Sequence, residues 1–484
     1  MTNQKIWFFN KRKSDRIYLW LIGLMLVGLV CSKFLMSITM ILCSLNLLLE
    51  ANFKLYWQKI KENHFLHLIV AFYLLHLISL LWSENLSYGL NDLRVKAPLL
   101  VIPVLLIAKP IEKSERKWLY LLFTLSLLVT SVINFCTYQF ALANHSVKDI
   151  RELSLFGSHI RYAVLIAFGF GICLFLSREL KKPRLLWFLI GAWFIFYTYY
   201  SQVLSGLLAL IIVITIQAVL QYKQMKWLII SGLAAGGISL IALTLFLFNP
   251  SKETTSNWGN IPEMREKWNK ISLLDFDSLD LKKQSLKTTL SRYLDSKKLP
   301  RNAFGLSSLN KSDVQNIENG YADVNETRFG LIARMYGLRY QIQHPQNPNG
   351  HSLLQRIESW QTAWQIIQKN WLFGVGAGDV ADEFEKKYNE NRSLLIKENR
   401  IRAHNSYLTY WLSFGIFGIL LFLYLQAAFF SKQIRDKNYL GILFVSISII
   451  SFLLEDTLET QTGVTFFAFF FAIYVSKETR LNDN

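Results

Sequence analysis

The sequence predicts an all-α, polytopic membrane protein with about twelve transmembrane helices and one large extracytoplasmic helical loop. Composition is the first reason: 52% of the 484 residues are hydrophobic, 14% are aromatic and the mean hydropathy is +0.26, which is too apolar for an ordinary soluble chain. The second is that apolar runs of membrane-spanning length recur from end to end. The third is that lysines and arginines gather in alternate short connections between those runs.

The apolar runs divide the chain into three parts. Nine spans fill residues 1–249, a polar loop covers 250–403, and three further spans with a cytoplasmic tail occupy 404–484. The shorter runs need flanking aromatic residues to cross a hydrocarbon core of about 30 Å. The expected spans are 17–32, 34–50, 64–82, 95–108, 118–141, 160–177, 185–200, 202–220, 226–248, 405–430, 438–454 and 462–475.

The net charge of +18 could indicate a nucleic-acid-binding protein, but its distribution favours membrane topology and excludes nucleic acid as the expected partner. The connections alternate between a cation-rich set and a poorer set, and the poorer set includes an acidic turn with Glu455, Asp456 and Glu459. By the positive-inside rule, we expect both termini in the cytoplasm and the long loop outside. The four cysteines fall within expected spans, which argues against a disulfide framework or a zinc site.

The loop 250–403 is too long for a bare connector, yet it is too poor in apolar runs to predict a clear second core. We therefore expect a helical lobe packed on the membrane domain. Its first part, residues 252–284, is polar and predicted to be irregular. Residues 351–371 instead carry an apolar stripe at helical spacing, which predicts an amphipathic helix along the membrane interface or on the lobe. The stripe consists of Leu353, Ile357, Trp360, Trp364, Ile367 and Trp371.

The stretch RIRAHNSYLTYWLSFGIFG, residues 400–418, places His404 and Asn405 at the outer start of an apolar helix. His404 would lie at headgroup level, beside a helix N-terminus whose free N–H groups and partial positive charge favour an anion. A neutral imidazole there is a candidate general base, although simple capping or interfacial anchoring is the plainer alternative. Gly415 and Gly418 follow at helical spacing, and we expect them to let a neighbouring helix approach closely.

Arginines in the outward region are candidates for binding phosphate, because the guanidinium group offers a planar fork of donors. Each could instead be a surface cation or a lipid anchor. A further pair, His159 and Arg161, lies at the outer end of the sixth span, where a charge entering an apolar run needs a partner such as an anionic headgroup. The loop arginines are Arg334, Arg339, Arg356, Arg400 and Arg402.

The pattern of His404, Asn405, nine residues, Gly415, two residues and Gly418 resembles the signature of bacterial O-antigen ligases and the related O-antigen polymerases. The resemblance extends to RIESWQTAWQIIQKNWLFGVGAGD (356–379) and to about twelve helices with a large outer loop before the third-last. It implies a fold like that of family C glycosyltransferases, with His404 as the catalytic base and Arg356 as a ligand of the diphosphate. Further candidate substrate ligands are Arg161, Arg334, Arg402, Asn405 and His159.

One position departs from the family pattern. Many members carry a Ser-Arg pair in the helix that here reads SQVLSGLLAL (201–210), and Leu204 stands where that arginine is expected. One phosphate contact is therefore missing or supplied from elsewhere, for which Arg161 is a candidate.

The resemblance implies an enzyme that transfers an undecaprenyl-diphosphate-linked glycan, the O-antigen, to a sugar hydroxyl of lipid A-core. The transfer would invert the anomeric carbon, use no metal or cofactor, and take place at the outer face of the bacterial inner membrane. A polymerase of O-antigen or exopolysaccharide, or a protein O-oligosaccharyltransferase, would share this chemistry with another acceptor. A transporter of a lipid-linked glycan is the alternative from a different class, and it would favour charged or broken helices near the midplane.

Overall fold

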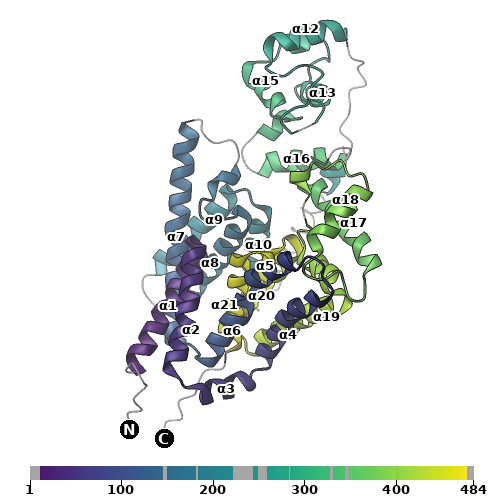
Figure 1. The fold of residues 1–484 in the computed structure, drawn as a ribbon. Coiled ribbons are helices and arrows are strands. Elements are labelled where there is room, and N and C mark those ends of the chain that lie inside the picture. The colour runs from purple at the N-terminus through teal and green to yellow at the C-terminus, as the bar shows by residue number, and fades with distance from the viewer. Residues whose placement is uncertain are drawn as a thin grey trace. The chain divides into compact units, whose positions relative to one another are not determined.

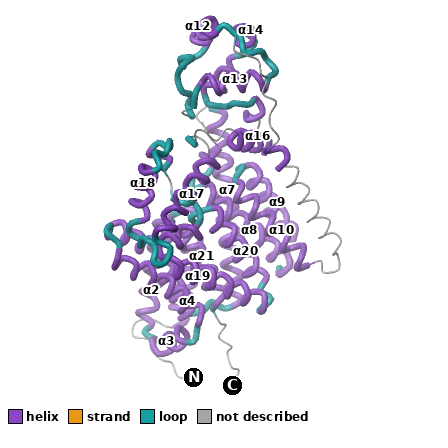
Figure 2. Tube along the Cα trace, turned by 90° about the vertical axis from the view of Figure 1, so that its right-hand side faces the viewer, coloured by secondary structure: helices purple, strands orange, loops and turns teal. Residues whose placement is uncertain are grey.

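The computed structural model describes residues 11–144, 150–180, 184–221, 244–248, 259–282, 284–327, 331–343, 348–349, 352–400 and 402–476. Within these ranges the chain is helical and contains no strand, which confirms the all-α, polytopic class (Figure 2). It groups into two compact units (Figure 1). The membrane unit comprises Met1–Gln221, Ala363–Glu383 and Arg402–Asn484, and the lobe unit comprises Tyr222–Thr362 and Phe384–Ile401.

The membrane unit contains six described helices that are long and apolar enough to cross a bilayer, namely α1, α2, α4, α7, α8 and α19. Three shorter apolar helices, α10, α20 and α21, accompany them. The helices are α1 (Lys11–Cys31), α2 (Lys33–Glu50), α3 (Phe53–Lys61), α4 (His64–Ser79), α5 (Leu86–Lys96), α6 (Pro98–Ala108), α7 (Lys113–Ala143), α8 (His159–Glu179), α9 (Arg184–Tyr200), α10 (Leu204–Gln221), α19 (Ser406–Arg435), α20 (Tyr439–Leu454) and α21 (Gln461–Val475).

Eleven of the twelve expected spans coincide with a helix in the described residues. The expected span 226–248 lies outside the described residues except for 244–248, which are helical. The expected span 95–108 is shorter than predicted, because α5 ends at Lys96 and α6 begins only at Pro98. Proline suits the first turn of a helix, where its missing N–H costs nothing. At 1.5 Å per residue, α6 reaches roughly 16 Å, about half of a bilayer core.

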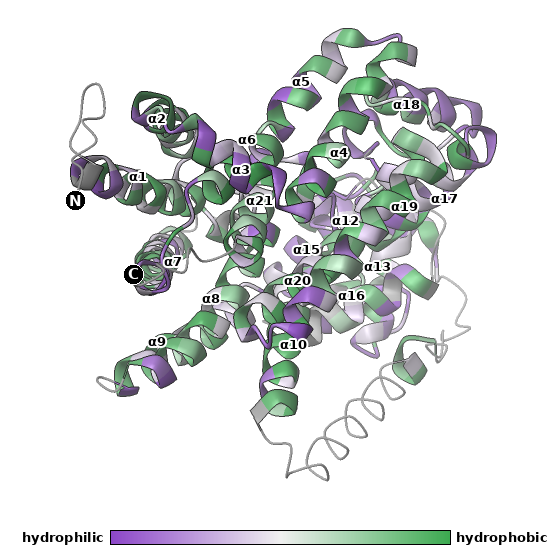
Figure 3. Ribbon diagram, turned by 90° about the horizontal axis from the view of Figure 1, so that it is seen from below, coloured by the Kyte–Doolittle hydropathy of each residue, from purple (hydrophilic) through white to green (hydrophobic). Residues whose placement is uncertain are grey.

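The core of the membrane unit is built around α21, whose residues from Gly463 to Val475 are all buried. A helix that is apolar on every side belongs in the interior of a bundle. Its Phe470 ring lies 4.8 Å from Phe168 of α8 and 5.6 Å from Phe444 of α20, measured between centroids. The hydropathy colouring in Figure 3 shows that the outer helices are largely apolar, and α9 exposes large apolar side chains such as Leu185, Phe188 and Leu189.

Cation-rich connections meet at one end of this unit. The end of α3 and the α6–α7 turn line one cavity of about 510 Å³ together with the start of α1. Lys59, Lys109 and Lys113 are among its lining residues, and Lys109 Nζ lies 2.7 Å from Asp15 and also pairs with Glu50.

The lobe unit has a core of its own, which corrects the expectation of none. Its described helices include α12 (Ile261–Ile271), α13 (Leu286–Ser296), α14 (Ala303–Ser307), α15 (Lys311–Glu318) and α16 (Leu331–Gln343). Part of the stretch expected to be irregular is therefore α12, which Asn260 caps and whose Met264 and Trp268 are buried. Each short segment contributes only a few residues to this core, so no long apolar run in the sequence predicts it. It comprises Met264, Trp268, Phe276, Leu286, Leu290, Tyr293, Leu294, Leu306, Val314 and Ile317.

The amphipathic helix expected near 351–371 is α17 (Ser352–Lys369), and its predicted stripe is only partly buried, since Ile367 is 1% exposed whereas Ile357 is 37% exposed. Buried positions include Ser359, Ala363 and Ile366, whereas Trp364 is 45% exposed. Small side chains permit close packing, and the large indole ring stays at the surface. Trp371 lies beyond the end of α17 and is also exposed. Helix α18 (Val380–Glu390) follows.

Candidate active site

Asn405 starts α19 and fixes the place of His404. Its backbone is extended, with φ of −155°, and its side-chain oxygen accepts hydrogen bonds from the N–H groups of Tyr407 and Leu408 at 3.0 and 3.1 Å. This is the standard role of asparagine at an N-cap. His404 therefore lies one residue before the cap with φ of +45°, and the asparagine supplies the helix cap instead of the histidine.

The His404 imidazole is paired with a buried carboxylate. Its Nδ1 lies 3.1 Å from Oε2 of Glu455, whose side chain is only 6% exposed, while the His404 side chain is 34% exposed. When the carboxylate accepts a hydrogen bond from Nδ1–H, Nε2 carries the lone pair and is free to accept a proton. The pair thus holds the imidazole in the tautomer that a general base needs.

Asp456, the next residue, fixes the backbone around the histidine. One carboxylate oxygen accepts the His404 N–H at 3.0 Å, and the other accepts the Thr409 hydroxyl at 2.7 Å. Burial raises the pKa of Asp456, and the positive charge of Arg402 opposes that rise. The turn after α20 therefore orients both the backbone and the imidazole of His404.

Arg161 belongs to the same corner of the membrane unit. It lies in the first turn of α8, it is half-buried, and it interacts electrostatically with Glu455 and Asp456. Its Nε is buried and has no hydrogen-bond partner among the described residues. His159 is the first residue of α8 and is also half-buried.

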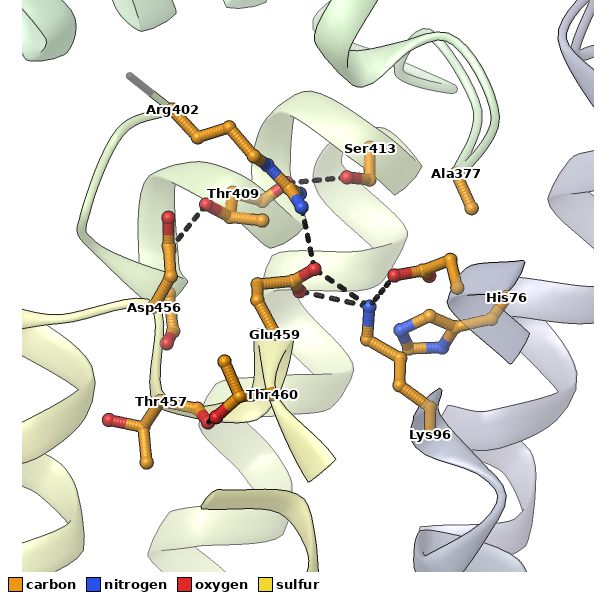
Figure 4. Close-up of polar contacts among 12 residues, drawn as sticks. His76, Lys96, Ala377, Arg402, Thr409, Ser413, Asp456, Thr457, Glu459 and Thr460 are labelled. Carbon is orange, nitrogen blue, oxygen red and sulfur yellow. Dashed lines mark hydrogen bonds and ion pairs between the residues drawn. The ribbon is translucent and has the colours of Figure 1, made fainter. Parts of the chain in front are cut away.

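Arg402 is held inside an ion network, which Figure 4 shows. Its Nη1 lies 2.7 Å from Glu459 and 3.2 Å from the Tyr88 hydroxyl. Lys96 Nζ lies 3.0 Å from Glu459 and 2.5 Å from Asp92. Burial acts to raise the pKa of Glu459, but Arg402 and Lys96 outweigh it and hold that pKa well below its usual range. Glu459 is therefore ionised and pairs with two cations, Arg402 and Lys96.

Arg356 and Arg334 belong to the lobe unit, whereas His404 belongs to the membrane unit. Arg356 lies in α17, where its carbonyl oxygen accepts the Ser359 hydroxyl at 2.9 Å. Arg334 lies in α16, and its side chain is outside the described set. Arg400, in the same unit, pairs with Glu385 at 2.7 Å, and the Arg339 guanidinium lies 4.9 Å from the centroid of the Phe246 ring.

The two glycines of the motif act differently from the expectation. Gly415 has φ of +63° and interrupts α19, and a Cβ there would lie 2.1 Å from the carbonyl oxygen of Leu372. The close neighbour is thus the glycine-rich segment 371–376 and not a helix. It is held by hydrogen bonds from the Val375 N–H to Leu412 and from the Ile416 N–H to Trp371, both at 2.9 Å. A Cβ at Gly418 would instead meet Phe414 of its own helix.

Sequence reasoning placed Glu455, Asp456 and Glu459 only as an acidic turn, and it gave Lys96 no role in the site. Their partners lie far away along the chain, so spacing alone does not pair them. A signal was present nonetheless, because Asp92 and Lys96 lie one helical turn apart and three carboxylates follow an apolar run. Charges at such places require partners.

The fold and this site define a polytopic membrane protein with a carboxylate-paired histidine at the start of a transmembrane helix. A family model described as O-antigen ligase matches residues 189–423, a range that includes His404, Asn405, Gly415 and Gly418. This match supports the O-antigen ligase family for the chain. The comparison with curated proteins gave no match.

Proposed function

We propose that this protein transfers an undecaprenyl-diphosphate-linked glycan to a sugar hydroxyl of lipid A-core, with His404 as the general base. The observation that carries the proposal is the 3.1 Å contact between His404 Nδ1 and Glu455, at the N-terminus of α19. Family membership supports glycosyl transfer of the ligase or polymerase type. The charge pattern supports cytoplasmic termini, and the proposal therefore has His404 at the periplasmic face of the inner membrane.

In the proposed reaction, Nε2 of His404 takes the proton of the acceptor hydroxyl as its oxygen attacks the anomeric carbon. The bond between that carbon and the diphosphate oxygen breaks, and the diphosphate departs with the electron pair. Direct displacement inverts the anomeric carbon. Glu455 stabilises the imidazolium that forms, as the carboxylate of a catalytic triad does. The products are a glycosylated acceptor and undecaprenyl diphosphate.

Arg161 is the proposed contact for the departing diphosphate within the membrane unit. It interacts electrostatically with Glu455 and Asp456 and leaves its buried Nε without a described partner. The start of α10 lies close by, since a Cβ at Gly206 would be 2.6 Å from the Cβ of Ala163 on α8. Arg161 is therefore near the start of α10, where Leu204 occupies the position of the arginine that many family members carry. Arginines stabilise a leaving group best where charge accumulates in the transition state.

Arg356 remains a proposed second diphosphate ligand through the family resemblance, and Arg334 and His159 remain proposed substrate ligands on the sequence pattern. Asn405 and Arg402 have partners inside the protein, namely the start of α19 and Glu459. We therefore assign these two to the support of the site and not to direct substrate binding.

The test is glycan transfer in vitro from an undecaprenyl-diphosphate-linked oligosaccharide to lipid A-core, with purified protein in lipid nanodiscs. We expect His404→Ala to lower kcat by roughly 10²- to 10⁴-fold, the usual contribution of a general base. The matched control is His64→Ala, an exposed histidine at the start of α4. Product NMR should show an inverted anomeric linkage. Equal transfer by wild type and His404→Ala would sink the assigned mechanism.

Separate reactions should offer lipid A-core, a second molecule of donor, and a peptide rich in serine and threonine. Transfer to lipid A-core alone supports the ligase. Transfer only to the donor or to the peptide would replace it with a polymerase or a protein oligosaccharyltransferase of the same chemistry. Movement of the donor across vesicles without any transfer would favour a transporter instead.

A further inference from the structure

Glu459 lies in the turn after α20, and it contacts both the segment before α19 and helix α5. Its carboxylate lies 2.7 Å from Arg402 Nη1 and 3.0 Å from Lys96 Nζ, and its side chain is 9% exposed. The Lys96 side chain is 2% exposed and also pairs with Asp92 at 2.5 Å. Asp92, Lys96, Arg402 and Glu459 form one ion network in which two cations balance two anions; Figure 4 shows its Lys96, Glu459 and Arg402 members.

The segment before α19 carries His404, and the turn after α20 carries Glu455, so each segment contributes one member of the proposed catalytic pair. Arg402 lies two residues before His404, and Glu459 lies four residues after Glu455. The ion pair between Arg402 and Glu459 thus ties the segment that carries the imidazole to the segment that carries its carboxylate. Lys96 of α5 pairs with Glu459, and the Tyr88 hydroxyl, also on α5, contacts Arg402 at 3.2 Å. Both contacts connect this ion pair to α5.

The network is sensitive to any change in its charge. A buried ion pair that loses one member leaves an uncompensated charge, whereas removal of both members leaves none. Without Lys96, the two carboxylates of Asp92 and Glu459 would share the single charge of Arg402. Glu459 would then be drawn away from its present position, and the loop of Glu455 with it.

We propose that Lys96 is a positioning residue for the transfer reaction. It keeps His404 and Glu455 in their relative position through its contact with Glu459, which in turn pairs with Arg402. The inference rests on the proposed function. Lys96 touches neither His404 nor the reacting atoms, so it acts on geometry alone. A displacement of about 1 Å at a reacting group can cost about 100-fold in rate.

The experiment compares Lys96→Met with three variants of the full chain in nanodiscs. Lys96→Arg keeps the charge, Asp92→Asn with Lys96→Met removes one charge of each sign, and Lys61→Met changes an exposed lysine of α3. We expect Lys96→Met to lower kcat by 30- to 100-fold with the KM of the donor changed by less than about 3-fold. The charge-balanced double variant and Lys96→Arg should recover at least 10-fold of that loss, and Lys61→Met should match wild type.

Hydrogen exchange supplies a readout that does not depend on activity. Peptides covering 402–409 and 452–460 should exchange faster in Lys96→Met, and the charge-balanced double variant should restore wild-type exchange. Unchanged exchange in these peptides, or a double variant as impaired as the single one, would overturn the inference. If wild type fails to transfer glycan while the exchange pattern follows expectation, the proposed function fails and the network is confirmed as the anchor of the His404 loop.

Discussion

The Glu455 carboxylate lies 3.1 Å from Nδ1 of His404, although 51 residues separate the two in the chain. The turn after α20 is docked on the start of α19 by two further contacts, since the Ser406 hydroxyl donates to the Glu455 carbonyl oxygen and the Asp456 carboxylate accepts the His404 N–H, each at 3.0 Å. These contacts orient the histidine before any substrate arrives. Preorganisation of this kind is what a catalytic base requires.

Replacement of Glu455 should impair catalysis more than binding. Glutamine keeps the shape and an acceptor oxygen but lacks the charge that stabilises an imidazolium, so Glu455→Gln should lower kcat by roughly 10- to 100-fold. The measurement is kcat for transfer at saturating donor, with Glu62→Gln as the control, since Glu62 is exposed after α3. A Glu455→Gln protein with wild-type kcat would mean that the pair has no role in proton transfer.

Replacement of Arg161 should weaken the hold on the diphosphate. Arg161→Gln removes the planar cation, so we expect the KM of the donor to rise roughly 10-fold and kcat to fall as well, because the leaving group loses stabilisation. Arg161→Lys should recover only part of the activity, since an ammonium group lacks the fork of donors. Arg178→Gln is the matched control, because Arg178 lies in the last turn of the same helix. Equal donor KM for Arg161→Gln and wild type would remove Arg161 from the site.

Hydropathy predicted the helical class and most membrane helices, because each span is a local property of about twenty residues. The pairing of Glu455 with His404 and of Lys96 with Glu459 could not be predicted, because it depends on how distant helices pack. The lobe core was missed for a related reason: Trp268 and Leu290 come from short helices and are buried singly. Gly415 was correctly expected at a close approach, but the partner proved to be a loop.

Gly415 should tolerate no side chain. Its φ of +63° disfavours any L-residue, and a Cβ would lie 2.1 Å from the Leu372 carbonyl oxygen. Gly415→Ala should therefore lower stability by roughly 2 to 4 kcal/mol and displace the segment that follows Trp371. The comparison is Gly337→Ala in α16, where a Cβ meets nothing within 4 Å, and which should gain up to about 1 kcal/mol. Thermal unfolding followed by tryptophan fluorescence would show opposite shifts, and equal shifts would contradict the assigned strain.

Glu326 should make the stability of the lobe unit depend on pH. It lies in the short helix η3 (Val324–Thr327), its side chain is 8% exposed, and Lys282 Nζ is 4.0 Å away. Burial raises the pKa of Glu326 from 4.5 to about 7, against the opposing charge of Lys282. The folded state therefore holds the proton more tightly than the unfolded state does. Stability is full below pH 4.5 and falls as the pH rises to about 7, by an amount on the order of 3 kcal/mol.

Glu326→Gln removes the titration while it keeps the shape of the side chain. The variant should show little pH dependence between pH 4.5 and 7, and at pH 7.5 it should be more stable than wild type because no charge has to be buried. Hydrogen exchange of peptides from 259–327, corrected for the intrinsic rate at each pH, measures this in the full chain. Glu263→Gln on the exposed side of α12 should retain the wild-type profile. A wild-type lobe equally protected at pH 5 and pH 7.5 would show that Glu326 remains ionised inside it, with Lys282 compensating its burial in full.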